Sequence, residues 1–470
     1  MMKILLSLLL CAPAFAASVD APAEGVVTYR DRALDVKAYV EGFPYKSFYF
    51  APKAGKVFFL NRGETETLRE ADFSPAAPVD FSQARELSKT DFTKRNLWGL
   101  KVSPKTGKVY VMGDEDNSET TNLYELLPDG SFKRLTSEGY IYSWALSPDG
   151  GRVAFAARSG KQEFTPGSVG VLDLATGDVK KVFMDSKALR MTWNTVSWKP
   201  DGAAVAVGVV CDEDRTHQDL LLAQADGSGA KTLLDCKTKN SVDPTWEWLD
   251  DDNLLYSGDA TGNTVVYRLE LATGKRVKLT DPKWNLTTAQ LVGPRLVALE
   301  RRPISTAVHV IDPLTGKTLS TTEYPASVAM LRGDRDTAFL SFDSPVIPYE
   351  VHALTLAADA PALVKVIEYP EELKKKVIHC DAKKVSYKTF DGYGAPGEKG
   401  TLHAFLYTPK APAKGADARL LVNSFYGGTN NYSSKIHMFC QAGFHVLSPA
   451  PRGSWDWGRE FHDKMQGDLG

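Results

Sequence analysis

Residues 145–150 read ALSPDG and residues 196–202 read VSWKPDG. In both stretches an apolar segment runs into a turn built on Pro, Asp and Gly. A second run of small apolar residues follows each turn, at 153–157 and at 204–210. Proline presets the first turn position and glycine supplies a positive φ, so each stretch predicts a tight β-hairpin.

The same turn recurs in degenerate form along the chain, near residues 52, 104, 250, 293 and 333. A second type of hairpin, closed by a polar Thr-Gly turn, recurs at 171–177, 269–274 and 310–316. Four strands per unit, repeated every 40 to 52 residues or so, is typical of the blades of a β-propeller. Seven such turns predict seven blades. The competing architecture, a β-sandwich, does not predict so regular a period.

Composition restricts the possible function classes. Of the 470 residues, 43% are hydrophobic and 24% are charged, and the formal net charge is −2. These values are ordinary for a globular protein with a sizeable core. Without a basic run or stripe, we expect no nucleic-acid partner. The eight histidines are scattered, so we expect no metal site and no cofactor.

The N-terminus resembles an export signal. Lys3 precedes a short apolar run at 4–10, and Ala14 and Ala16 form a small-x-small cleavage site, so the mature chain would begin at Ala17. The run is too short to cross a bilayer as a helix, and no later apolar segment is long enough to anchor the chain. We therefore predict export to the periplasm or the extracellular space, with residues 1–16 removed and no membrane anchor.

Four cysteines remain after cleavage, and their spacing does not resemble that of metal ligands. Cys211 and Cys236 fall at the ends of two neighbouring predicted strands, which makes them the first choice for a disulfide pair in an exported protein. Two buried free thiols are the alternative for these residues.

The pattern changes after a charged, helix-like stretch at 371–376, which marks the domain junction. Strands are expected at 385–390, 402–410, 419–425 and 444–448, with a short helix at 433–442 that ends at Gly443. The continuous apolar run at 420–422 suits a strand buried on both faces. Strand, helix, strand with a short crossover predicts a parallel, doubly wound sheet.

These motifs, in this order and spacing, resemble those of the prolyl oligopeptidase family of serine peptidases. The resemblance rests on the propeller turns and on five later stretches, at 390–392, 406–410, 425–428, 451–454 and 457–462. It implies a mainly β protein with an N-terminal segment at 17–35, a seven-bladed propeller at 36–375 and the first part of an α/β-hydrolase domain at 376–470.

The resemblance also implies an activity. Members of the family cleave oligopeptides, often after proline, with a Ser/Asp/His triad. Tyr426 stands where the family has a tyrosine whose hydroxyl donates a hydrogen bond to the oxyanion of the tetrahedral intermediate. Gly427 and Gly428 would let the backbone turn closely beneath it. An ordinary turn after a strand is the alternative reading of this stretch, and Arg452 is expected to be structural rather than catalytic.

No Gly-x-Ser-x-Gly nucleophile elbow occurs in the sequence. In the family this elbow, the Asp and the His all follow the 457–462 stretch. We therefore expect the sequence to be a fragment of a longer reading frame or a frameshifted copy, inactive as given. The alternative is a noncatalytic propeller that binds a partner and retains a remnant of the hydrolase domain.

Overall fold

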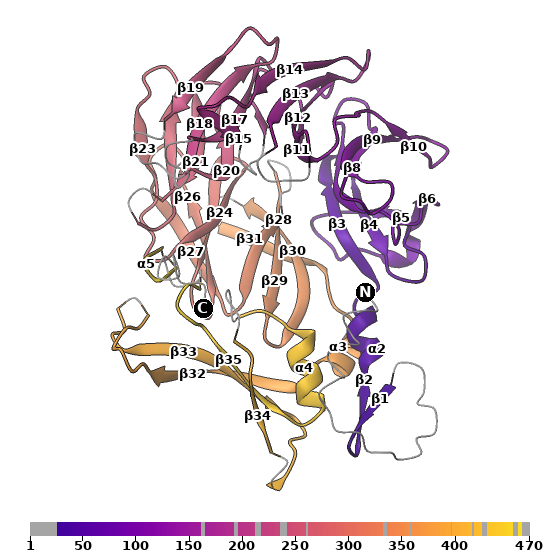
Figure 1. Ribbon diagram of the computed structural model, residues 1–470, viewed down its shortest axis with the longest axis vertical. Helices are drawn as coiled ribbons and strands as arrows, with labels where there is room; N and C mark the ends of the chain where they lie inside the picture. The colour runs from indigo at the N-terminus through magenta and orange to yellow at the C-terminus, as the bar shows by residue number, and fades with distance from the viewer. Residues whose placement is uncertain are drawn as a thin grey trace.

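The computed structural model describes residues 26–160, 165–191, 196–211, 218–235, 242–259, 262–331, 336–357, 360–395, 397–415, 418–424, 430–454 and 459–462. A large β-structured body fills one end of the molecule, and a smaller sheet with helices fills the other (Figure 1). The N-terminal strands and helix lie beside the smaller part.

The large body consists of seven antiparallel sheets, each built from strands that are consecutive in the described sequence. The predicted seven-bladed propeller is therefore confirmed. In the fourth blade the first strand is split into β15 and β16, which both pair with β17. The blades are β3 (Tyr45–Ala51), β4 (Lys56–Asn61), β5 (Leu68–Asp72), β6 (Arg85–Ser88); β7 (Leu97–Val102), β8 (Val109–Gly113), β9 (Asn122–Leu126), β10 (Phe132–Arg134); β11 (Ile141–Leu146), β12 (Arg152–Arg158), β13 (Gly167–Asp173), β14 (Val179–Met184); β15 (Leu189–Met191), β16 (Ser197–Trp198), β17 (Ala204–Cys211), β18 (Gln218–Gln224), β19 (Ala230–Leu234); β20 (Val242–Trp248), β21 (Asn253–Gly258), β22 (Val265–Glu270), β23 (Arg276–Lys278); β24 (Leu286–Val292), β25 (Arg295–Arg301), β26 (Thr306–Ile311), β27 (Thr318–Tyr324); β28 (Ser327–Leu331), β29 (Ala338–Ser344), β30 (Ile347–Ala357) and β31 (Ala360–Ile367).

The two Pro-Asp-Gly turns form the hairpins that the sequence predicts. Gly150 and Gly202 have φ values of 67° and 71°, in the left-handed region that glycine adopts without steric cost. The amide of Gly150 donates to the carbonyl of Ser147 at 2.8 Å, and that of Gly202 donates to Lys199 at 2.9 Å. Each hairpin thus joins the first two strands of its blade.

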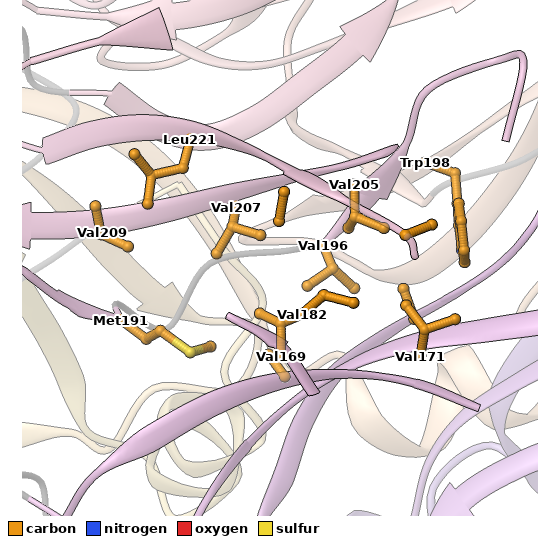
Figure 2. Close-up of a cluster of buried hydrophobic side chains, with 14 residues drawn as sticks. Val169, Val171, Val182, Met191, Val196, Trp198, Val205, Val207, Val209 and Leu221 are labelled. Carbon is orange, nitrogen blue, oxygen red and sulfur yellow. The ribbon is translucent and has the colours of Figure 1, made fainter. Parts of the chain in front are cut away.

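Neighbouring blades are held together by apolar packing. Figure 2 shows valines of the third and fourth blades interdigitating with Met191 and Trp198. Trp198 also donates from Nε1 to the carbonyl of Ala145 at 3.0 Å, and the Arg152 guanidinium lies 4.9 Å from the centre of its ring. Burying each such side chain stabilises the fold by about 1.5–3 kcal/mol.

The first and last blades share no strand, since each sheet is built from its own consecutive strands. Aromatic side chains pack across the junction between them. Phe50 of β3 stacks on Phe339 of β29 at 3.9 Å between ring centres, and Phe73 contacts the same ring edge-on at 5.5 Å. One backbone hydrogen bond crosses this junction, from Val79 to the carbonyl of Val366 at 2.9 Å. Side-chain contacts and this bond therefore close the propeller ring within the described residues.

The smaller part is a four-stranded mixed sheet in the order β32-β33-β35-β34. Strand β34 runs parallel to β35, and helix α4 connects them, as expected for a strand–helix–strand unit. Strands β32 and β33 pair antiparallel, so the prediction of a parallel sheet holds for β34 and β35 alone. The elements outside the propeller are β1 (Val26–Tyr29), β2 (Arg32–Asp35), α2 (Val36–Glu41), α3 (Glu371–Val377), β32 (Cys380–Lys388), β33 (Thr401–Pro409), β34 (Leu420–Val422), α4 (Ser434–Gln441), β35 (His445–Pro449) and α5 (Arg459–His462). Two short 3₁₀ turns, η1 (Pro52–Ala54) and η2 (Phe81–Gln83), lie within the first blade.

The prediction that 420–422 is buried on both faces is wrong. Strand β34 lies at the edge of the sheet, and its Leu420 and Val422 side chains are 55% and 62% exposed. The sequence pattern was that of a central strand, but only one neighbouring strand, β35, pairs with β34 in the described residues. The result is an exposed apolar edge, which natural proteins usually cover or blunt.

Candidate active-site segment and its contacts

The connection between β34 and α4 is the candidate site, because ligands of α/β sheets bind at the carboxyl ends of parallel strands. Tyr426, the predicted oxyanion donor, lies in this connection but outside the described residues. Both flanks are described. Asn423 donates its amide to the carbonyl of Leu447 at 2.8 Å, and the Ser433 hydroxyl caps α4 by accepting from the amide of Ile436 at 3.4 Å. The flanks fix where the connection leaves the sheet and where it enters the helix.

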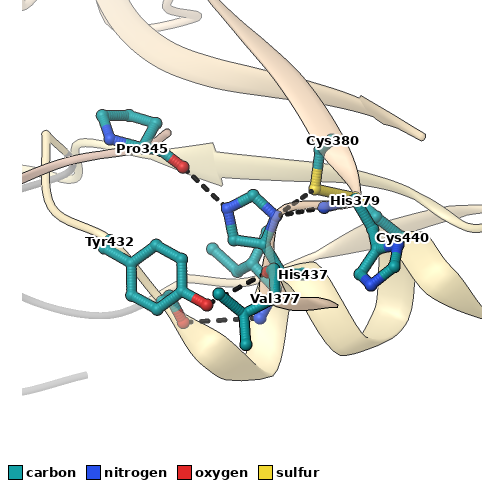
Figure 3. Close-up of a disulfide and its surroundings, with 9 residues drawn as sticks. Pro345, Val377, His379, Cys380, Tyr432, His437 and Cys440 are labelled. Carbon is teal, nitrogen blue, oxygen red and sulfur yellow. Dashed lines mark hydrogen bonds between the residues drawn. A yellow bond between two sulfur atoms is a disulfide. The ribbon is translucent and has the colours of Figure 1, made fainter. Parts of the chain in front are cut away.

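Two residues of the last blade, Asp343 and Pro345, hold the described end of this connection and helix α4. The carboxyl of Asp343 accepts a hydrogen bond from the Tyr432 amide at 2.5 Å. The Tyr432 hydroxyl donates to the carbonyl of Val377 at 3.1 Å. His437 of α4 donates from Nε2 to the carbonyl of Pro345 at 2.7 Å (Figure 3). The propeller therefore positions the loop and helix directly.

His437 is fully buried, and its two ring nitrogens have different partners. Nε2 carries the proton for Pro345, while Nδ1 accepts from the amide of His379 at 3.0 Å and lies 3.4 Å from Sγ of Cys380. Burial lowers the pKa of His437 to about 4, so the ring is neutral at physiological pH. It acts as a structural connector with a defined tautomer.

Asp343 shows the opposite effect of burial on an acid. Desolvation raises the pKa of its carboxyl to about 7, although the hydrogen bond from Tyr432 and the nearby Arg301 both favour the charged form. The contact between the propeller and the connection thus contains a carboxyl that titrates near neutral pH.

These two groups affect stability in opposite directions. Between about pH 4 and pH 6.5 an unfolded histidine binds a proton that buried His437 does not, so the His437 contribution to the free energy of unfolding rises with pH. Between about pH 4 and pH 7 folded Asp343 keeps a proton that the unfolded carboxyl has lost, so its contribution falls with pH. Each slope is about 1.4 kcal/mol per pH unit, and together they should nearly cancel.

We therefore expect single variants to reveal the two slopes. Relative to the native chain at each pH, Asp343→Asn should gain stability as pH rises from 4.5 to 6.5, and His437→Gln should lose it. Both amides can replace the hydrogen bonds of the native residues. Urea unfolding at three pH values measures the effect, with Asp381→Asn as the control for an exposed carboxyl on β32. Parallel pH profiles for the two variants would contradict the assignment.

Arg452, which is expected to be structural, contacts two residues in and next to the 390–392 stretch. Its guanidinium forms an ion pair with Asp391 and lies 5.8 Å from the centre of the Tyr393 ring. It thereby connects the 390–392 turn to the 451–454 loop, two of the stretches that carry the family resemblance. The next residue, Gly453, has φ 92° and donates its amide to the carbonyl of fully buried Phe461 at 3.0 Å.

A Ser-His-Glu group that the sequence did not suggest lies on β32 and β33. The Ser386 hydroxyl is 2.9 Å from Nδ1 of His403, and Nε2 of the same ring is 2.8 Å from the Glu398 carboxylate. This order of groups is that of a nucleophile, a base and an orienting acid. Ser386, however, lies within a regular strand rather than on a strand-to-helix turn. We infer that Ser386 and Glu398 have a structural role, because their hydrogen bonds hold the His403 ring in place on the sheet.

The structure contains a disulfide that sequence reasoning missed. Cys380, at the start of β32, is bonded to Cys440 near the end of α4, with 5.7 Å between their Cα atoms. The cysteines are 60 positions apart in sequence, and only the fold brings them together. The predicted pairing of Cys211 with Cys236 cannot be compared, because Cys236 and the side chain of Cys211 lie outside the described residues.

Among the described residues, no group of three or more His, Cys, Asp and Glu side chains comes together in a way that could hold a metal ion. No described helix is long and apolar enough to cross a membrane.

Comparison with known proteins gives no match at the level of sequence families. No family model and no curated protein matches the chain. Solved structures do match. One, from a study of two prolyl endopeptidases and the role of inter-domain dynamics in their catalysis and specificity, superposes with a TM-score of 0.69 at 16% identity over 90% of this chain. The fold is that of the prolyl oligopeptidases.

A second structure of this fold is prolyl oligopeptidase B from Galerina marginata, bound to a 35mer substrate for hydrolysis and macrocyclization. It also superposes with a TM-score of 0.69, at 13% identity over 91% of this chain. The chain spans 63% and 65% of the lengths of the two matched proteins. The resemblance that the sequence motifs indicated is thus confirmed at the level of the fold.

Proposed function

We propose that this chain is the propeller and the first part of the hydrolase domain of an exported serine peptidase that acts on oligopeptides. The observation that carries the proposal is the prolyl oligopeptidase fold, found over 90% of the chain. The sequence motifs support it independently, because 425–428 and 451–454 flank α4 and β35 in the order of that family.

In this proposal Tyr426 supplies a hydrogen bond to the oxyanion. A preorganised donor stabilises the charge that develops in the transition state for acyl transfer. Support comes from the described end of the connection, where Asp343 of the propeller accepts a hydrogen bond from the Tyr432 amide, and from helix α4, where His437 donates to Pro345.

The nucleophile, the acid and the base of the triad would be encoded beyond residue 470. The exposed edge strand β34 supports this part of the proposal, because a further strand would pair with its free edge and further helices would cover the face with Leu420 and Val422. The signal-like segment at 1–16 and the buried Cys380–Cys440 disulfide support export to an oxidising compartment. A noncatalytic propeller module is the second candidate, since the sequence itself has no nucleophile elbow.

Labelling with a fluorophosphonate probe tests the proposal. We expect no label on residues 1–470 and strong labelling of the product of a reading frame that continues into a Gly-x-Ser-x-Gly elbow. Ser386→Ala serves as the control and should leave labelling of the longer protein unchanged. N-terminal sequencing of the same secreted preparation should begin at Ala17.

Two results would contradict the proposal. Labelling of the 470-residue chain at Ser386 would place the nucleophile on β32 instead. A stop codon directly after codon 470, together with soluble folded protein from the chain alone, would favour the noncatalytic module.

A further inference from the structure

A cavity of about 350 Å³ lies where six segments of the chain meet. It is lined by residues of α2, of β3 in the first blade, of the turn after β4, of the β30 region in the last blade, of α3, and of the stretch that leads into α4. Its volume falls within the range of sites that bind small ligands. Tyr432, whose amide is held by Asp343, forms part of its wall.

Aromatic side chains dominate the lining, with seven rings of which five are tyrosines. Phe43 lies 5.5 Å from Tyr369, and Phe48 stacks on Tyr349 at 6.5 Å between ring centres. Burial raises the pKa of Tyr349 to about 12 and also raises that of Tyr39, so their hydroxyls remain neutral. The Tyr39 hydroxyl is buried and has no hydrogen-bond partner within the described part of the chain.

The charged residues of the lining are both cations, Lys46 and Arg62. Lys46 is neutralised by Glu66, with 2.5 Å between Nζ and Oε2. The exposed Arg62 guanidinium has no ion-pair or hydrogen-bond partner in the described ranges. The cavity therefore presents one available positive charge beside neutral aromatic rings, an arrangement that favours an anionic group on the ligand.

Strand β3, four of whose residues line the cavity, also has a free edge. As the first strand of its sheet, β3 pairs with β4 alone in the described structure, so its other edge has no partner strand. A β-bulge lies between Lys46 and Tyr49, and Ser47 within it has φ 56°, an unusual value for a non-glycine residue. Bulges and strained residues of this kind are concentrated near binding sites.

We propose that this cavity binds an extended peptide segment, with a proline or aromatic ring among the tyrosines and a terminal carboxylate on Arg62. Aromatic-lined grooves bind extended, proline-containing peptides, and a free strand edge can hydrogen-bond to a peptide backbone. Arginine is well suited to a carboxylate because its planar guanidinium can donate two parallel hydrogen bonds. This inference rests on the proposed function and adds a second contact with peptides to it. The experiment that tests it measures peptide affinity and not catalytic activity.

Calorimetric titration of the purified 470-residue chain tests the proposal. The probes are the peptide Ac-Ala-Ala-Phe-Pro with a free carboxylate and the same peptide as its C-terminal amide. We expect the carboxylate form to bind about tenfold more tightly, a factor that corresponds to about 1.4 kcal/mol. Arg62→Gln should remove this difference by weakening the carboxylate form alone. Tyr349→Ala should weaken both probes.

Lys53→Gln is the matched control, since it removes an exposed positive charge from the same blade, next to β3, without touching the cavity. It should leave both affinities unchanged. The proposal is overturned if neither probe binds at millimolar concentration, or if Arg62→Gln retains the preference for the carboxylate. Because Arg62 is exposed, this variant is expected to fold even if Tyr349→Ala does not. The labelling experiment above is independent of either outcome.

Discussion

Replacing Tyr426 by Phe is expected to lower kcat by about 10²–10³-fold in the longer peptidase that we propose. The change removes one hydroxyl and keeps the ring. If that hydroxyl donates to the oxyanion, it stabilises the transition state and not the bound substrate, so KM should change little. Steady-state hydrolysis of a chromogenic prolyl peptide measures both constants.

Tyr387→Phe is a suitable control for this experiment. It removes the hydroxyl of a partly exposed tyrosine on β32, in the same sheet but away from the β34–α4 connection. Its kcat should equal that of the native enzyme. If Tyr426→Phe lost less than about tenfold in kcat, or raised KM instead, Tyr426 would be an ordinary turn residue and the proposed oxyanion role would be rejected.

The propeller could be predicted from sequence because its determinants are local and repeated. Each blade carries its own turn residues, such as Gly150 and Gly202, whose positive φ values match the predicted hairpins. The helix before β35 was predictable for the same reason, with the Ser433 cap and Gly443 at φ 91° marking its two ends.

Features that depend on distant residues could not be predicted in this way. The apolar run at 420–422 has the composition of a buried strand, and only the sheet order shows that β34 lies at an edge. The bonds from His437 to Pro345 and from Tyr432 to Asp343 join residues 92 and 89 positions apart. No local pattern reports such contacts, so the sequence indicated the candidate loop but not what holds it.

The Cys380–Cys440 disulfide is expected to contribute strongly to the free energy of unfolding of the four-stranded sheet and α4. A cross-link that closes a loop of 60 residues stabilises the folded state by about 4 kcal/mol in the chain-entropy model. Cys380→Ala/Cys440→Ala should therefore lower the free energy of unfolding by about 3–4 kcal/mol. Urea unfolding with and without a reductant measures this, and the double variant should lose the part of the response to the reductant that the Cys380–Cys440 bond causes.

The same experiment bears on the compartment in which the protein folds. Both cysteines are almost fully buried beside His437, so a reductant should act on them mainly after local opening of α4. Cys211→Ala/Cys236→Ala is the matched control, and peptide mapping under non-reducing conditions tests whether that pair is also linked. Free thiols at Cys380 and Cys440 in the purified protein would rule out the disulfide. A linked pair would support the proposed export, because a reducing cytosol would not maintain this bond between β32 and α4.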